Sequence, residues 1–142
     1  MPEGLHPSTH PPLPPTTEDD RVLWLRLLRS RRVGISTFYR LMGEHGNAAR
    51  ALDALPEIAN KAGLSKYEVC SKEYASAEMA LGHAAGAHLI CRGDSVYPAS
   101  LAEIHDAPPM LWARGNLEAL KRPMIALVGA RNASSLGTRM AR

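Results

Sequence analysis

The residues best suited to bind a ligand are Gly129, Ala130 and Arg131, followed by Ser134. The two small residues let a ligand approach the backbone, and arginine offers a planar fork that holds a phosphate through two hydrogen bonds. Ser134 or Ser135 is a suitable N-cap for a following helix, whose start attracts anions. The pattern predicts a phosphate site, and the alternative is that Arg131 caps a neighbouring element or is merely solvated.

A strand and a helix must position this loop. Residues 124–128 are all apolar, opened by Pro123 and closed by Gly129, which is typical of a strand buried on both faces. Residues 136–142 have the pattern of the first turns of a helix. The loop between them lacks the G-x-G-x-x-G spacing of a dinucleotide site. We therefore expect the start of a Rossmann-like unit that binds a phosphate through a fixed positive charge.

Basic residues gather in two segments of a chain whose net charge is only +3. Residues 21–50 contain seven arginines against one acid, Glu44, and residues 121–142 contain five basic residues and no acid. Within the first segment, Arg29, Arg31 and Arg32 adjoin residues 33–36, which resemble the turn of a helix-hairpin-helix. These three arginines are candidate contacts to a nucleic-acid backbone. The alternative is a helical interaction domain with solvated arginines.

Several classes of protein do not fit the sequence. The two cysteines lack metal-ligand spacing, which favours a reduced, cytoplasmic setting. We find no apolar run near the roughly 20 residues that span a bilayer, and no signal-peptide pattern. No catalytic pair, metal site or cofactor motif is predicted.

The chain divides into three parts. Residues 1–16 form a proline-rich tail expected to be disordered, residues 17–86 a helical module, and residues 87–142 the incomplete beginning of an α/β domain. The expected fold class is therefore α plus α/β, truncated, in an N-terminal portion of a longer protein.

Local signals place the elements of these parts. Thr17 should cap the first helix, and Ser36 a second one that runs through Glu44. One short helix should end at Leu55 and another should begin at Pro56. Ser65 should cap a longer helix whose inward positions are Cys70, Tyr74, Ala77, Leu81 and Ala84. Strands are expected at residues 88–91 and 110–113, a short helix at 99–103 and one helical turn at 117–120, with Trp24 and Trp112 in the core.

Two ordered motifs resemble the DNA-processing protein A family (DprA, also called Smf). The first is Tyr97-Pro98-x-x-Leu101-x-x-Ile104-x-Asp106-x-Pro108-Pro109-x-Leu111-x-x-x-Gly115-Asn116, and the second is Ile125-Ala126-x-Val128-Gly129-Ala130-Arg131-x-x-Ser134-x-x-Gly137. The resemblance covers about residues 17–142. It implies a helical domain similar to a sterile-alpha-motif or helix-hairpin-helix unit, followed by an extended Rossmann domain.

The resemblance also implies a function without catalysis. Members bind single-stranded DNA, protect incoming strands in natural transformation, load the RecA recombinase and form homodimers. The family's loop falls on Gly129, Ala130 and Arg131, so Arg131 is the expected phosphate contact, with Ser134 a weaker candidate. Leu136 stands where members often have tyrosine. The alternatives are a nucleotide-binding enzyme of the lysine-decarboxylase-like phosphoribohydrolase type and a helical protein-interaction module.

Overall fold

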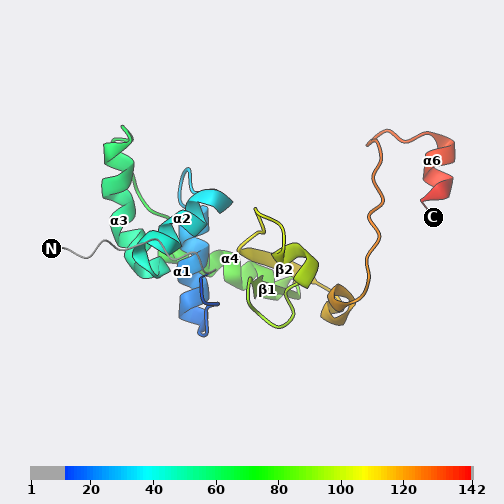
Figure 1. Ribbon diagram of the computed structural model, residues 1–142, viewed down its shortest axis with the longest axis horizontal. Helices are drawn as coiled ribbons and strands as arrows, with labels where there is room; N and C mark the ends of the chain where they lie inside the picture. The colour runs from blue at the N-terminus through cyan, green and yellow to red at the C-terminus, as the bar shows by residue number, and fades with distance from the viewer. Residues whose placement is uncertain (1–11, 142) are drawn as a thin grey trace.

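A computed structural model describes residues 12–141. Four helices come first, followed by an antiparallel pair of strands and then a segment that leads away to a last short helix (Figure 1). The elements are α1 Glu18–Arg29, α2 Ile35–His45, α3 Ala48–Lys61, α4 Lys72–Ala84, β1 Ala87–Cys91, α5 Ala99–Ala102, β2 Met110–Arg114, the 3-10 helix η1 Leu117–Lys121 and α6 Ser135–Met140. We call residues 17–114 the packed body and residues 115–141 the C-terminal segment.

A proline-rich tail was expected over residues 1–16. Residues 1–11 of it lie outside the described residues. Residues 12–16 contain neither helix nor strand. They nevertheless contact the packed body, because Pro15 is buried and the ring of Pro14 lies against Gly93.

The predicted cap of the first helix is confirmed. The side chain of Thr17 accepts a hydrogen bond from the backbone N–H of Asp20 at 3.1 Å. Glu18 and Asp19 complete an acidic first turn, which is favoured by the positive end of the helix dipole. The two predicted strands are also present as β1 and β2.

Two helix boundaries differ from the prediction. Gly34, not Ser36, is the N-cap of α2, and no side chain caps this helix. Pro56 does not divide the third helix, since α3 runs unbroken from residue 48 to residue 61. Proline removes one backbone hydrogen bond. However, Leu52, Leu55 and Ala59 are all buried on one face of α3, and this packing keeps the helix continuous.

The prediction for the fourth helix was wrong in both its start and its inward face. Ser71 caps α4, whose buried residues are Ala75 and Met79, whereas Tyr74 and Leu81 are exposed. The residues before α4 are held outside the helix by tertiary hydrogen bonds. In particular, the N–H of Cys70 donates to Ser30 Oγ at 3.0 Å, and Arg26 Nε donates to the carbonyl of Cys70 at 2.9 Å.

The core of the packed body lies where α1, α2 and α3 meet. Trp24 packs edge-to-face on Phe38 with ring centroids 5.1 Å apart, which confirms that Trp24 is a core residue. A second cluster joins α1 and α4 to the sheet through Val22, Leu25, Ala75, Met79 and the half-buried Trp112. The helical module and the two strands are therefore packed on each other.

The sheet is a single antiparallel pair in which Ala87 faces Arg114 and Cys91 faces Met110. Arg21 of α1 reaches this sheet and forms a forked ion pair with Asp94, at 2.9 and 3.0 Å. Asp94 also accepts the backbone N–H of Cys91 at 2.8 Å. Burial raises the pKa of the Cys91 thiol to about 11, so this cysteine is protonated and inert at neutral pH.

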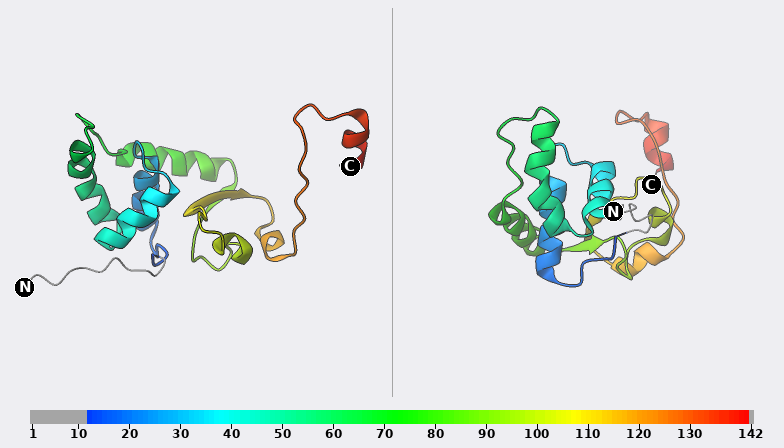
Figure 2. Two further views of the ribbon diagram at one scale, coloured as in Figure 1. Left: turned by 45° about the horizontal axis from the view of Figure 1, so that its top comes forward. Right: turned by 60° about the vertical axis from the view of Figure 1, so that its left-hand side comes forward.

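The predicted buried strand at residues 124–128 is not formed. The segment is extended but unpaired, and Ile125 and Val128 are 91% and 96% exposed. A strand needs a neighbouring strand for its backbone hydrogen bonds. Within residues 12–141, the only paired strands are β1 and β2, which pair with each other. Figure 2 shows this segment running away from the packed body before it reaches α6.

Candidate nucleic-acid interface

The loop that carries the predicted phosphate site ends in a well-defined helix cap. The Oγ of Ser134 accepts the backbone N–H of Gly137 at 3.2 Å, and the hydroxyl of Thr138 donates to the Ser134 carbonyl at 3.1 Å. Ser134 is therefore the N-cap of α6, one of the two residues predicted for this role. One lone pair of its side chain is already used by the cap, which leaves its hydroxyl proton and second lone pair for a ligand.

The small residues leave the backbone of the loop open. A Cβ placed on Gly129 would meet no atom within 4 Å, and Ala130 is exposed. An open hollow of the surface between the loop and α6 is lined in part by Gly129, Ala130 and Ser134. A ligand could therefore approach the main chain here, as the sequence predicted.

Arg131 lies in the same loop and is exposed. Within residues 12–141 its guanidinium takes part in no ion pair. It does not line the hollow beside α6, so it stands at the outer side of the loop. The structure thus presents a fixed positive charge to solvent at this loop.

The three arginines of the first basic segment are not equivalent. Arg29 forms a forked pair with Glu78 of α4, at 2.8 and 2.7 Å, and this bond raises the pKa of Arg29. Arg31 and Arg32 are exposed in the turn between α1 and α2. The structure therefore separates Arg29, which connects two helices, from its two neighbours, which face solvent.

Glu78 is the residue that sequence reasoning missed at this site. It binds Arg29 and also accepts the indole N–H of Trp112 at 3.0 Å, so it joins α1, α4 and β2. The bond to Arg29 holds the pKa of the Glu78 carboxyl below its usual value. Because 49 residues separate the partners, no local pattern could have paired them.

The two groups of cations lie at different places in the fold. The turn that carries Arg31 and Arg32 belongs to the helical module, whereas the loop that carries Arg131 directly precedes α6, which lies at the far end of the long axis from α3 (Figures 1 and 2). The structure does not bring these predicted residues into one site.

Neither a metal-binding cluster nor a membrane-spanning helix is present in the described part of the chain. Among residues 12–141, His, Cys, Asp and Glu side chains nowhere gather in threes in a way that could hold a metal ion. None of the helices in that range is long and apolar enough to cross a membrane.

Comparison with known proteins accounts for most of the chain. Residues 18–80 match the family described as a DprA-like N-terminal HHH domain, and residues 88–142 match the family described as DNA recombination-mediator protein A. The DNA processing protein DprA of Streptococcus pneumoniae (strain ATCC BAA-255 / R6) is 48% identical over 46 residues, which are 32% of this chain and 16% of that protein. The two family matches follow each other in the expected order and together leave only the first residues and a short gap unmatched. The chain therefore belongs to the DprA family.

Proposed function

We propose that the protein is a recombination mediator that binds single-stranded DNA without cutting it. Membership of the DprA family supports a role in DNA processing. The observation that carries the proposal is the exposed guanidinium of Arg131, in an open loop of the region matched to the recombination-mediator family.

The chemistry of the loop suits a phosphate of the DNA backbone. A guanidinium binds a phosphate through two charge-assisted hydrogen bonds, and the small side chains of Gly129 and Ala130 let the strand approach the main chain. Ser134 can add one hydrogen bond from its hydroxyl. Contacts of this kind follow the backbone and read no bases, which suits a protein that must accept strands of any sequence.

Three further parts of the proposal come from the family. We infer that the protein protects incoming strands during natural transformation, that it loads the RecA recombinase onto them, and that it acts as a homodimer in the cytoplasm. Each follows from what the family resemblance implies. None requires a catalytic group, so the proposal assigns no enzymatic activity.

The test is the Arg131→Ala variant, titrated with a fluorescent oligo(dT) strand at several salt concentrations. Loss of a charge-assisted contact should weaken binding by about 1–3 kcal/mol. It should also reduce the slope of log affinity against log salt by about 0.7, the value for one phosphate of a single strand.

The matched control is Arg139→Ala, which removes an exposed arginine from α6 and changes the net charge equally. If both variants bind oligo(dT) as tightly as the parent protein does, Arg131 does not contact the strand. Release of a free base from a nucleotide by the parent protein would instead favour the alternative of a phosphoribohydrolase.

A further inference from the structure

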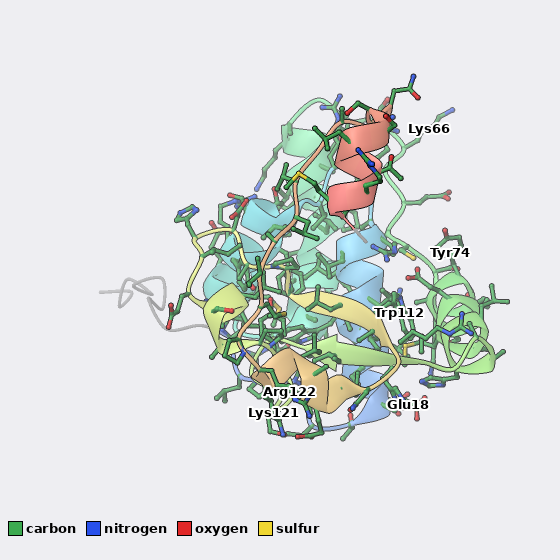
Figure 3. The ribbon with its side chains drawn as sticks, turned by 90° about the vertical axis from the view of Figure 1, so that its right-hand side faces the viewer. Glu18, Lys66, Tyr74, Trp112, Lys121 and Arg122 are labelled. Carbon is green, nitrogen blue, oxygen red and sulfur yellow. The ribbon has the colours of Figure 1, made fainter. Side chains whose placement is uncertain are left out.

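A second group of exposed cations lies on the helical module. The turn between α1 and α2 carries Arg31 and Arg32, and the segment between α3 and α4 carries Lys66. We call these three residues the hairpin patch. All three are exposed, and within the described part of the chain none of them forms an ion pair. Figure 3 shows Lys66 at the edge of the molecule, with its side chain directed outward.

Two tertiary hydrogen bonds, each between a side chain and the backbone, hold the two parts of the patch beside each other. The hydroxyl of Tyr67 donates to the carbonyl of Arg31 at 2.6 Å, across 36 residues of sequence. Three residues further on, the N–H of Cys70 donates to Ser30 Oγ at 3.0 Å. These tertiary bonds place the segment that carries Lys66 beside the turn that carries the arginines, whatever conformations the three cationic side chains adopt.

Two of the three cations occupy a backbone conformation that side chains disfavour. Arg32 has a φ of 62° and Lys66 a φ of 53°, and they are the two non-glycine residues with positive φ among residues 12–141. Glycine or asparagine adopts this conformation more readily than arginine or lysine does. Residues held in such conformations gather at functional sites, and here both are cations on one surface.

The charge of the hairpin patch is not neutralised locally. Glu78 is occupied by Arg29, and Glu68 is the acid that lies in the same segment as Lys66. Three cations against one acid leave a positive surface, and its exposed guanidinium and ammonium groups are suited to the oxygen atoms of phosphates.

We propose that the hairpin patch binds the sugar-phosphate backbone of single-stranded DNA as a contact separate from Arg131. This inference rests on the proposed function, since it assumes that the protein binds single strands. The segment after α3 lies toward the end of the long axis opposite α6, so the two contacts can be removed independently (Figures 1 and 2). Binding at two places would let the protein hold a strand along its length, through charge and without reading bases.

The test is a triple variant, Arg31→Gln, Arg32→Asn and Lys66→Asn. Asparagine is chosen because it tolerates positive φ, so the melting temperature should stay the same or rise. Titration with fluorescent oligo(dT) should show affinity reduced by about tenfold or more, as expected for lost charge-assisted contacts. The salt slope should fall by about 2, since three single-strand phosphate contacts contribute about 0.7 each. Loss of DNA affinity without loss of stability is a combination that a purely structural role would not produce.

The matched control is Arg50→Gln, Arg114→Gln and Arg122→Gln, three exposed arginines elsewhere in the chain that form no ion pair among the described residues. It changes the net charge equally, and its affinity should stay within about threefold of the parent value, since only long-range attraction is lost. If the patch variant binds oligo(dT) no more weakly than this control does, the inference is overturned.

The remaining outcomes separate the inference from the proposed function. A parent protein that does not bind oligo(dT) at all would overturn both. Weak binding by Arg131→Ala together with control-like binding by the patch variant would overturn only the inference. A patch variant that keeps oligo(dT) but loses binding to poly-glutamate would identify the patch as a surface for an acidic protein, which also overturns it.

Discussion

The packed body and the C-terminal segment use the same kinds of residue in opposite ways. In the packed body, Leu41 is fully buried, and the guanidinium of Arg21 forms an ion pair with Asp94. In the C-terminal segment, Leu127 is 79% exposed, and Arg131 has no ion-pair partner among residues 12–141. Leucine and arginine occur in both regions, and what differs is whether other elements surround these side chains.

This difference shows which cations are available to a ligand. Arg21 and Arg29 are held in forked pairs that join α1 to the strand region and to α4. Removing either from its carboxylate would leave a half-buried charge unpaired, so neither is suited to a partner molecule. Charges that remain open to solvent, such as Arg31 and Arg131, are the ones from which binding can be proposed.

The largest expected difference between the two regions comes from truncating one leucine in each. Leu41→Ala should lower the free energy of unfolding by about 2–5 kcal/mol, because a buried side chain is replaced by a cavity. Leu127→Ala should change it by less than about 0.5 kcal/mol, as for an exposed position. Urea unfolding followed by the fluorescence of Trp24 and Trp112 measures both. Equal losses would show that residues 124–128 have a partner in solution. The two regions would then not differ in how they bury leucine.

Glycine-to-alanine substitution should also have opposite effects in the two regions. A Cβ on Gly82 of α4 would overlap the ring of Trp112, so Gly82→Ala should destabilise the packed body by about 1–3 kcal/mol. At Gly137 of α6 the nearest atoms to such a Cβ are 3.6 Å away. Gly137→Ala should therefore raise the helicity of α6, since alanine is favoured there by about 1 kcal/mol. Thermal melting and circular dichroism test the pair, and an unaffected Gly82→Ala protein would mean that α4 and β2 are not in contact.

The smallest effect concerns the pH dependence of the packed body. Arg29 holds the pKa of Glu78 below its unfolded value, so the stabilisation is present above the unfolded pKa of about 4.3 and is lost as the pH falls through the folded pKa. Glu78→Gln should cost about 1 kcal/mol at pH 7, a value reduced by the partial exposure of Arg29, and less than that at pH 3.

The control for this pair is Glu57→Gln, which removes an ion pair with Lys61 that is exposed on both sides. It should leave the stability unchanged at either pH. A Glu78→Gln protein that behaves like Glu57→Gln at pH 7 would show that the pair with Arg29 is solvated and does not join the two helices.

The sequence predicted the features that depend on neighbouring residues. Caps at Thr17 and Ser134 were foreseen because each hydrogen bond closes over three residues. The short strands at residues 88–91 and 110–113 were foreseen from apolar runs bounded by glycine and proline. Helical spacing failed for α4, because it offered two apolar faces and tertiary packing chose Ala75 and Met79 over Tyr74 and Leu81.

By itself, the sequence determined the caps at Thr17 and Ser134, the two short strands β1 and β2, and the loop in which Arg131 precedes α6. Only the tertiary structure decided which arginine is paired and which is open, and that Lys66 joins Arg31 and Arg32 on one surface. It also decided that residues 124–128 stay exposed. The physical reason is that a cap or a turn closes within a few residues, whereas an ion pair, a buried face or a sheet needs partners brought from far along the chain.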